Sequence, residues 1–504
     1  MKRRSDRRQF LQTAALATAG ASVLGAPAVA ARPGRGVNGA TTADVVVVGA
    51  GFGGMVAAYR LQQMGHSVIV VDALDRVGGR SWSTTLSDGT FLDIGAGWTG
   101  STQFNIQRLI HELGLSTYTQ YGLGPNQGLN LFIGSDQIIR PYSGLSFPVN
   151  AEAQAEIANA ILTIDSMAQT IPVEAPWTAP RAEEWDKISA GVFARDMISD
   201  PDALAVVMAN LTTIFGLSPF AVSLLHLLWD SRMAGGVEKF GPVEGGSVQY
   251  RIVGGTQQIP LKIAQRLGAG AFVLGSPVRE LNQDNTGVTV VAEGATLRAT
   301  RVIVAIPTCL TGFIRYNPIL PSDRAQLIQR TPQGSAMKIQ LVYDRAFWRD
   351  AGFTGNTFAI NGSIVPQTLD AGGPAGTNTP GILGCFIDDD AARDLGRLSW
   401  MERQNRVIQE LVPRFTPQVW NLSRTITPNY FEFISQDLEW ARGDYASTPG
   451  PRVLTASGFG PAIRAPFGRI HWAGVDTATI WYQSIDGAAQ SGERAANEVV
   501  QAGL

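Results

Sequence analysis

The sequence is poor in charged side chains and in residues that bind metals. Charged residues make up 16% of its 504 residues, against about 25% in typical soluble domains. The formal net charge of −2 excludes the strongly basic surface that nucleic-acid-binding domains present. The 4 histidines are isolated, and the 2 cysteines, Cys309 and Cys385, lie far apart without a CxxC motif. We therefore predict neither a metal centre nor a disulfide framework.

Long apolar runs are also absent beyond the N-terminal region. No segment after residue 31 reaches the length of about 18 apolar residues that a membrane-spanning helix needs. We therefore expect a soluble mature protein without a membrane anchor. Glycine, in contrast, is abundant, with 56 residues, or about a ninth of the chain against roughly 7% on average. A large, apolar, glycine-rich protein is suited to burying a flat organic cofactor.

The N-terminal region has the features of an export signal. Residues 1–8 hold five basic side chains and one acidic one, and an uncharged stretch with an Ala-x-Ala cleavage pattern follows. The pair Arg7-Arg8, with the following Gln-Phe-Leu, resembles the twin-arginine signal, whose pathway exports folded proteins. An ordinary secretory signal is the alternative. We predict a signal peptide at 1–31, a flexible linker at 32–43, and a periplasmic or extracellular location.

A glycine-rich turn between a strand and a helix is the clearest motif of the chain. Residues 44–48 form a β-branched run typical of a strand buried on both faces, and GAGFGG follows directly. In this G-x-G-x-x-G pattern the glycines make the tight turn, admit a pyrophosphate close to the backbone, and let the helix pack on the strand; they are Gly49, Gly51 and Gly54. A second apolar run at 67–71 ends at Asp72, which can accept a hydrogen bond from a ribose hydroxyl. The order of these parts predicts a dinucleotide site, for FAD or for NAD.

Two further segments extend this predicted site. Arg80 follows two glycines in DRVGGR, and its guanidinium group suits a pyrophosphate. Gly95 and Gly97 in DIGAGW would let the backbone approach a planar ring system.

The rest of the chain gives a coarser pattern. The spacing of apolar residues predicts mostly helices over 151–240. Short β-branched runs predict strands at 271–274 and 301–306. The stretch 361–381 is rich in Gly, Pro, Thr and Asn, which predicts a loop.

Taken together, these motifs resemble those of the flavin-containing amine oxidases, the monoamine oxidase group. The resemblance spans about residues 44–500 and is carried by VVVVGAGFGG, DALDRVGGR, FLDIGAGWTG, LLWDSRMAGG, RIVGGTQQIP, GSAMKIQLVYDRAFWRDAGF and RIHWAGVDTATIW. It implies an α/β fold with a Rossmann-like FAD-binding domain, assembled from three chain segments, and an α+β substrate-binding domain. The implied boundaries are 44–121, 245–325 and 440–504 for the FAD-binding domain, and 122–244 and 326–439 for the substrate-binding domain.

The resemblance also assigns a cofactor and the residues around it. It implies FAD, held non-covalently because Asp444 stands where the mammalian enzymes have the cysteine that attaches FAD. Val278 matches the valine whose backbone meets the adenine ring, and Asp476 is one methylene shorter than the family's glutamate at the ribityl chain. The residues that the resemblance places at the cofactor are Gly49, Gly51, Phe52, Gly54, Asp72, Ala73, Gly79, Arg80, Gly97, Trp98, Val278, Gly474, Asp476, Ser484 and Ile485.

Lys338 is the first of two residues to which the resemblance gives a catalytic role. In GSAMK it matches the family lysine that holds a water molecule against flavin N5. Strand alternation places Lys338 opposite Met337 and Ile339. By itself, this pattern equally describes a solvated lysine on a half-buried strand.

Tyr445, the second catalytic residue, matches one of the two aromatic side chains between which the family's substrate amine passes. Ser484 occupies the position of the other aromatic residue. The aromatic cage is therefore open on one side unless Trp481 or Tyr482 closes it, and a wider or more polar substrate becomes plausible. Phe240 and Trp481, together with Ser484, are candidates for the substrate cavity.

The implied reaction is the oxidation of an amine C–N bond to an imine, which hydrolyses to an aldehyde or ketone, while O2 is reduced to H2O2. Three alternatives share the fold: an L-amino-acid oxidase, a polyamine oxidase, and a flavin dehydrogenase or desaturase. The first is disfavoured because the stretch after Trp98 lacks an arginine for the substrate carboxylate, which such oxidases often have. No nucleic-acid partner is expected, and a homo-oligomer stays open.

Overall fold

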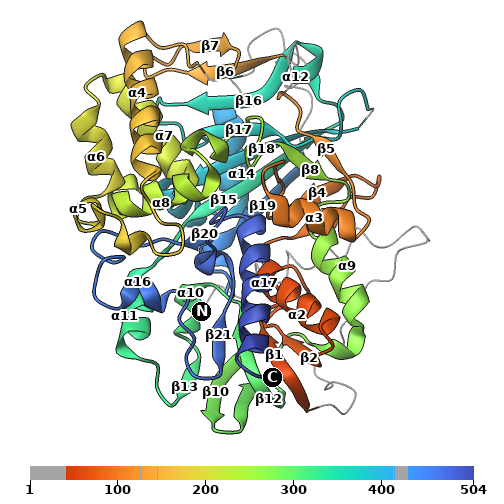
Figure 1. The fold of residues 1–504 in the computed structure, drawn as a ribbon. Coiled ribbons are helices and arrows are strands. Elements are labelled where there is room, and N and C mark those ends of the chain that lie inside the picture. The colour runs from red at the N-terminus through yellow and green to blue at the C-terminus, as the bar shows by residue number, and fades with distance from the viewer. Residues whose placement is uncertain (1–40, 124–127, 145, 378, 412–413, 415–428) are drawn as a thin grey trace.

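The computed structural model describes residues 41–504, apart from 124–127, 145, 378, 412–413 and 415–428. The predicted signal peptide (1–31) and nearly all of the predicted linker (32–43) lie outside the described residues. Two large sheets with helices around them form the structure, and the first sheet lies at the lower end of the view in Figure 1.

The first sheet has eight strands and carries the glycine-rich motif at the end of its first strand. Its order is β13-β10-β11-β12-β1-β2-β9, with β21 paired to β12. Strand β1 pairs in parallel with β2 and β12. Its valines alternate between two core clusters, one on each face of the sheet, which confirms the predicted strand buried on both faces. The strands are β1 Thr42–Val48, β2 Val68–Val71, β9 Phe272–Val273, β10 Val278–Asp284, β11 Gly287–Ala292, β12 Ala295–Val304, β13 Arg315–Asn317 and β21 Ile470–Trp472.

Four helices pack in one core cluster on a face of this sheet. They are α2 Phe52–Gln63, α3 Phe104–Glu112, α9 Gln258–Leu267 and α17 Ile485–Gln501. The last helix of the chain, α17, lies alongside α2, the first of these four (Figure 1). A β-carbon on Gly492 would lie 2.2 Å from the carbonyl oxygen of Gly53, so only glycine permits this close contact.

The second sheet has seven strands in the order β19-β15-β18-β17-β16-β6-β7. Every residue of its strand β15 is buried. Met337, Ile339 and Leu341 pack with α12, α13 and α14, so Lys338 and Gln340 point to the opposite face. The bounds are β6 Leu129–Ile133, β7 Ile139–Tyr142, β15 Ala336–Tyr343, β16 Phe353–Ala359, β17 Gln367–Asp370, β18 Gly381–Asp388, β19 Asn429–Ile434, α12 Phe347–Asp350, α13 Asp389–Gly396 and α14 Trp400–Leu411.

A helical layer flanks the second sheet, on the left of Figure 1. Its core is a single apolar cluster. Asn150 caps α4 by accepting a hydrogen bond from the backbone of Ala153 at 2.8 Å, and Asp200 caps α7 in the same way. The helices are α4 Ala151–Ala168, α5 Ala182–Asp186, α6 Ala190–Met197, α7 Pro201–Phe215 and α8 Leu224–Ala234.

The remaining elements are short. They are β3 Ser83–Thr85, β4 Phe91–Asp93, β5 Thr117–Thr119, β8 Tyr250–Ile252, β14 Gln333–Gly334, β20 Asp444–Ser447, α10 Thr308–Thr311, α11 Ser322–Arg330 and α16 Phe459–Ala462, with 3-10 turns η1 Pro176–Thr178, η2 Pro219–Ala221, η3 Val237–Phe240, η4 Ala269–Ala271, η5 Ser435–Asp437 and η6 Val475–Thr477.

The predicted elements agree with these bounds except in the predicted loop and at the end of the predicted linker. The helices over 151–240 and the strands near 271–274 and 301–306 are confirmed. The predicted loop over 361–381 is wrong at 367–370, which form β17, and at 381, where β18 begins. Strand β17 forms because it pairs with β16 on one side and β18 on the other, and these contacts outweigh its unfavourable composition. Strand β1 also starts two residues inside the predicted linker.

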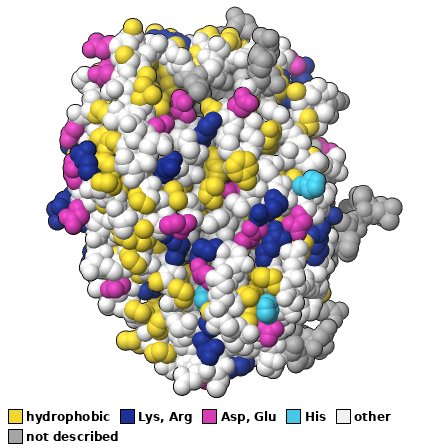
Figure 2. All heavy atoms as spheres, in the orientation of Figure 1, with side chains coloured by type: hydrophobic (Ala, Val, Ile, Leu, Met, Phe, Trp, Pro, Cys, Tyr) yellow, Lys and Arg dark blue, Asp and Glu magenta, His cyan; other side chains and the backbone are white. Residues whose placement is uncertain are grey.

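The surface combines charged and apolar side chains. Figure 2 shows yellow apolar side chains interspersed with Lys, Arg, Asp and Glu over the visible face. Among the residues that the structure describes, no helix is both long enough and apolar enough to cross a bilayer.

We predict that Gly54→Ala destabilises the protein. A β-carbon at this position would lie 1.9 Å from the carbonyl oxygen of Gly49, and such overpacking costs about 1–3 kcal/mol or more. Thermal unfolding of the two proteins measures the difference. Gly270→Ala is the control, because its β-carbon would meet no atom within 4 Å. Equal unfolding temperatures for the two variants would contradict the prediction.

Candidate active site

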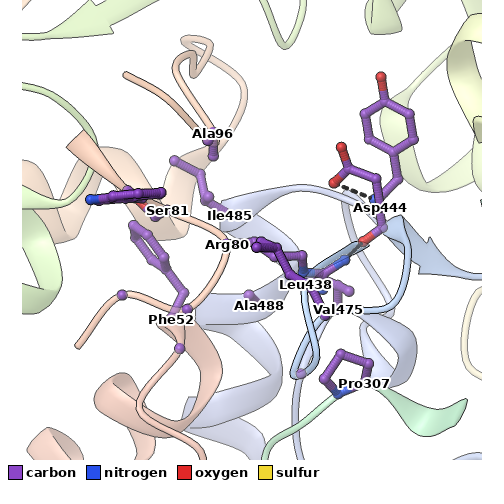
Figure 3. A pocket seen from close by; sticks show the side chains of 18 of the residues that line it. Phe52, Arg80, Ser81, Ala96, Pro307, Leu438, Asp444, Val475, Ile485 and Ala488 are labelled. Atoms are coloured by element: carbon purple, nitrogen blue, oxygen red, sulfur yellow. Dashed lines mark hydrogen bonds between the residues drawn. The ribbon is translucent and has the colours of Figure 1, made fainter. Parts of the chain in front are cut away.

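A cavity of about 1100 Å³ is lined by residues of both large sheets. It brings together chain segments that are several hundred residues apart. Figure 3 shows part of its wall, with Phe52, Arg80 and Asp444 among the labelled residues. Of the residues predicted at the cofactor or substrate, those on this wall are Gly49, Gly51, Phe52, Asp72, Ala73, Gly79, Arg80, Gly97, Trp98, Phe240, Val278, Lys338, Tyr445, Gly474, Asp476, Trp481, Ser484 and Ile485.

Gly54 is the one predicted residue that does not line the cavity. Its α-carbon instead faces the carbonyl of Gly49. This contact gives Gly54 the packing role that the motif predicted, between helix and strand.

The N-terminus of α2 forms a cradle for an anion. Gly51 precedes α2 as its N-cap and provides no side-chain cap for the first-turn N–H groups. A β-carbon on Gly51 would meet nothing within 4 Å, so the backbone is open to the cavity there. Arg80 adds a positive charge to the same wall, and its Nη1 donates a hydrogen bond to the carbonyl oxygen of Tyr445. Free N–H groups, the helix dipole and a guanidinium group together fit a pyrophosphate.

Asp72 lies at the end of β2, where its carboxyl group can bind a ribose. Its Oδ2 accepts from the backbone N–H of Ala50 at 2.5 Å and its Oδ1 from that of Leu74 at 2.7 Å. Burial raises the pKa of this carboxyl group. Each oxygen retains a second lone pair for a hydroxyl donor. With the α2 cradle and Val278 on the same wall, these residues fit the adenosine half of FAD.

Asp476 ties two other segments together beneath the cavity. Its Oδ2 accepts from the N–H of Thr308 at 2.6 Å, and its Oδ1 accepts from the N–H of Ser447 at 2.9 Å. The predicted contact of Asp476 with the ribityl chain would use the lone pairs that remain. Both bonds also explain why a carboxylate is needed here, independently of the cofactor.

Ser484 caps the helix that begins beside it. Its hydroxyl donates to the carbonyl oxygen of Trp481 at 2.7 Å and accepts from the N–H of Gly487 at 3.2 Å. The helix α17 begins at Ile485, directly after Ser484. The hydroxyl of Ser484 is therefore engaged in local structure.

Lys338 is buried in the cavity wall, with 7% of its surface exposed. The alternative of a solvated lysine on a half-buried strand is therefore wrong, because β15 is covered on both faces. Its Nζ donates to the carbonyl oxygens of Asp93 and Gly95, both at 2.7 Å, and lies 4.5 Å from the centre of the Trp98 ring. Burial lowers the pKa of Lys338 to about 7, although Asp93 and Asp444 oppose this shift.

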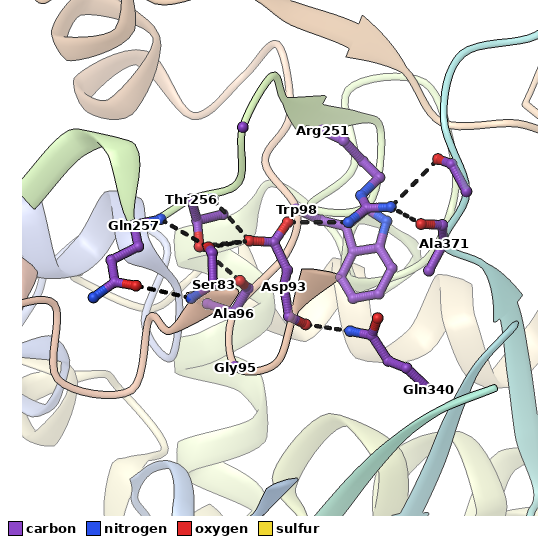
Figure 4. Close-up of polar contacts among 12 residues, drawn as sticks. Ser83, Asp93, Gly95, Ala96, Trp98, Arg251, Thr256, Gln257, Gln340 and Ala371 are labelled. Carbon is purple, nitrogen blue, oxygen red and sulfur yellow. Dashed lines mark hydrogen bonds and ion pairs between the residues drawn. The ribbon is translucent and has the colours of Figure 1, made fainter. Parts of the chain in front are cut away.

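A buried ion pair holds the loop that binds Lys338 (Figure 4). Asp93 and Arg251 are 0% and 1% exposed, and Arg251 Nη2 lies 3.0 Å from Asp93 Oδ2. The other oxygen of Asp93 accepts from Ser83 Oγ and from the N–H of Thr256. Arg251 also donates to the carbonyl oxygen of Ala371. This network fixes the start of the loop 93–98.

The motifs of the sequence did not by themselves indicate a role for Asp93 or Arg251. A signal was present, since each charge interrupts an apolar motif, FLDIGAGW and YRIVGG. Charged residues are seldom fully buried unless they are paired, so two such residues predict a buried pair. Their mutual contact spans 158 residues of sequence and does not follow from either motif alone.

The aromatic residues lie on different parts of the wall. Phe240 and Trp481 face each other edge-to-face with ring centres 6.4 Å apart, and the indole N–H of Trp481 donates to the carbonyl oxygen of Thr102 at 3.2 Å. Tyr482 donates its hydroxyl to the carbonyl oxygen of Ser447 at 2.7 Å. Trp481 and Phe240 thus form an aromatic wall beside Ser484, where the sequence lacks the second cage residue.

Tyr445 lines the cavity from β20. Its φ of 54° is a left-handed conformation that a side chain disfavours. Gly216 leaves room for this ring, since a β-carbon there would lie 3.1 Å from it, closer than an ordinary van der Waals contact. The hydroxyl donates to Asp388 Oδ1 at 3.4 Å, and burial raises the pKa of Tyr445 well above its ordinary value.

Comparison with known proteins identifies the family. Residues 52–500 match the family of flavin containing amine oxidoreductases. The chain is 31% identical over 462 residues to the probable flavin-containing monoamine oxidase A of Dictyostelium discoideum. The alignment covers 91% of this chain and 98% of that protein.

Two solved structures have a similar fold. One is putrescine oxidase with bound putrescine, with a TM-score of 0.84, 31% identity, and coverage of 91% of this chain and 99% of that one. The other is cyclohexylamine oxidase from Brevibacterium oxydans IH-35A, with a TM-score of 0.83, 27% identity, and coverage of 91% and 99%.

The chain belongs to the family of flavin-containing amine oxidoreductases. It is an FAD-dependent oxidoreductase that acts on the CH–NH2 group of amines, with the amine oxidase architecture that the motifs predicted.

We predict that Arg251→Met destabilises the protein by about 3–5 kcal/mol, because it leaves the buried charge of Asp93 without a partner. Thermal or denaturant unfolding measures the loss. Arg181→Met is the matched control, because Arg181 pairs with Glu184 in solvent and exposed pairs contribute little. An unfolding temperature for Arg251→Met equal to that of the control would contradict the role of the pair.

Proposed function

We propose that this amine oxidase acts on a neutral primary monoamine, holds FAD non-covalently, and passes the electrons to O2. The observation that carries the proposal is the position of Lys338, whose buried amino group is fixed in an aromatic cavity wall by two carbonyl oxygens. The proposed roles of the individual residues follow from this geometry.

The wall disfavours a charged substrate. Trp98, Phe240, Phe386 and Trp481 all line the cavity, and desolvation favours the neutral form of an amine. FAD, when bound, supplies the acceptor for the two electrons and hydrogen of the amine α-carbon, and the resulting imine hydrolyses to an aldehyde or ketone. The apolar wall limits the access of bulk water to the reacting carbon.

Lys338 holds a water molecule in this proposal. Two of its N–H groups are used by the carbonyl oxygens of Asp93 and Gly95, so one position on the nitrogen remains. In the neutral amine that position is a lone pair, which accepts a hydrogen bond from the water molecule. Because burial lowers the pKa of Lys338 to about 7, the neutral form is populated near neutral pH.

Non-covalent attachment follows from Asp444. This residue stands where the family's covalently flavinylated members have cysteine, and its Oδ1 accepts from the N–H of Tyr445 at 2.8 Å. A carboxyl group held in this way lacks the thiol chemistry of cysteine. FAD should therefore be released by acid precipitation, whereas colour that stays with the pellet contradicts the proposal.

A monoamine is preferred over a diamine or an amino acid. The two similar solved structures are named for a diamine and for a cyclic monoamine, so the family accepts both classes. The Phe240–Trp481 wall offers aromatic surface to the carbon skeleton of the substrate, which favours an arylalkylamine or cycloalkylamine. The segment after Trp98 has no arginine for a carboxylate.

The N-terminal segment supports a proposed route out of the cell. Arg7-Arg8, the uncharged stretch and the Ala-x-Ala pattern favour export through a pathway for folded proteins. Such a route would let the chain fold around non-covalent FAD before export.

Hydrogen peroxide release from a substrate panel tests the proposed function. We expect phenylethylamine or cyclohexylamine to give peroxide at higher kcat/KM than putrescine or L-leucine. A preference for L-leucine would contradict the proposal and indicate an amino-acid oxidase. Reduction of an artificial electron acceptor without any peroxide would instead indicate a dehydrogenase.

We predict that Lys338→Met keeps FAD bound but slows turnover by about 100-fold, the order of magnitude that a positioned proton-transfer group contributes. Stopped-flow absorbance measures flavin reduction and reoxidation separately. In the unmodified protein the activity should rise with pH through about 7, as Lys338 loses its proton, and this inflection should be absent from the variant.

Lys187→Met is the control for this prediction, because Lys187 is exposed and pairs with Glu183 far from the cavity wall. We expect it to retain the rates and the inflection. Unchanged kinetics in Lys338→Met would refute the proposed role of Lys338.

A further inference from the structure

A fully buried carboxyl group lies behind the cavity wall. Asp230 on α8 is 0% exposed, and its Oδ2 accepts a hydrogen bond from Nε2 of Gln483 at 2.5 Å. Gln483 lines the cavity, just before the start of α17. Two oxygen atoms at this contact, Oδ1 of Asp230 and Oε1 of Gln483, have no hydrogen-bond partner among the described residues. An unpaired buried oxygen is unfavourable, and here there is one on each side of a single contact.

The groups around Asp230 offer it no positive charge in the part of the chain that the structure describes. His226, one turn earlier on α8, is buried, and burial lowers its pKa to about 3. Tyr482, on the segment beside α8, is also neutral, because burial raises its pKa well above the ordinary value. Asp165 of α4 accepts hydrogen bonds from the neighbouring Ser231 and from Val237. An ionised Asp230 would be a buried charge without a counter-ion.

A neutral Asp230 satisfies both unpaired atoms. With the proton on Oδ1, the carboxyl O–H can donate to Oε1, while Nε2 keeps its hydrogen bond to Oδ2. A carboxylate only accepts hydrogen bonds and cannot form this pair. We propose that Asp230 is a positioning residue whose neutral carboxyl group forms two hydrogen bonds with Gln483 and thereby holds residues 481–484 as part of the substrate wall.

The backbone of this segment explains why it needs a partner. Trp481 and Gln483 have φ values of 47° and 65°, in the left-handed region that side chains disfavour. Trp481 carries the ring that faces Phe240, so a shift of the segment would move the aromatic wall. Burial supports the neutral form of the acid, because it raises the pKa of Asp230 to about 8. The assignment of this wall to the amine rests on the proposed function, whereas the pair itself does not.

Variants at both positions test the positioning role. Asp230→Asn can form the same two hydrogen bonds with the Gln483 amide, so we expect its KM to stay within about twofold of the unmodified protein. Asp230→Leu leaves the amide unpaired and should raise KM by about tenfold, while FAD content and kcat change little. The double variant Asp230→Leu/Gln483→Leu should lose less than the sum of the two single variants, since neither partner is then left alone. If Asp230→Asn is as impaired as Asp230→Leu, or if Asp230→Leu is unchanged, the inference is overturned.

A second measurement tests the pair without reference to activity. Infrared spectra at neutral pH should show the C=O band of a protonated carboxyl group that disappears in Asp230→Asn. The folded pKa of Asp230 lies above its ordinary value of 3.8, so the stability gained from binding this proton is lost as pH rises. The unfolding temperature of the unmodified protein should therefore fall relative to Asp230→Asn between pH 4 and about 8. A missing band, or a difference in unfolding temperature that is independent of pH, overturns the neutral pair even if amine oxidation is confirmed.

Discussion

The buried ion pair between Asp93 and Arg251 fixes the part of the chain on which the active site depends. Asp93 ends β4 and Arg251 lies in β8, and neither charge reaches solvent. Removing two charges from water costs free energy. This cost is offset only because further hydrogen bonds surround both groups. The loop after Asp93 then offers its carbonyl oxygens to Lys338, which comes from strand β15 of the second large sheet. The Lys338 contact therefore joins the second large sheet to the loop that follows the small β3-β4 sheet.

The cavity disfavours charge on the residues around it. Burial lowers the pKa of Lys338 and raises those of Asp444 and Asp230. An amine that enters this environment is likewise favoured in its neutral form, which is the form that can be oxidised in the proposed reaction. Arg80 and the N-terminus of α2 lie on the same cavity wall, and their positive charge suits the pyrophosphate of FAD.

The sequence predicted the elements whose causes are local. The GAGFGG turn, the buried β1 and the helix after it each follow from a few adjacent residues, and the cavity contains the predicted residues except Gly54. The resemblance to a family indicated Lys338, although its alternation pattern alone described an exposed residue equally well. What the sequence could not provide were contacts between distant segments. Strand β17 forms only because two other strands pair with it.

Contacts between side chains that are far apart in the sequence were likewise not predictable from the sequence. Asp93 and Arg251 are 158 residues apart, and Asp230 and Gln483 are 253 apart. The sequence also could not predict the role of the Ser484 hydroxyl. Its position suggested only a missing aromatic residue, whereas in the structure the hydroxyl caps α17. In each case the function of a side chain depends on a partner that folding brings to it.

The most direct test is anaerobic mixing of the purified protein with phenylethylamine that carries hydrogen or deuterium on its α-carbon. If the buried Lys338 wall holds a neutral amine against FAD, the flavin absorbance should bleach in a single phase, and deuterium should slow the bleaching because the α-carbon bond breaks in that step. Flavin that stays oxidised with phenylethylamine, cyclohexylamine and putrescine alike would contradict the account.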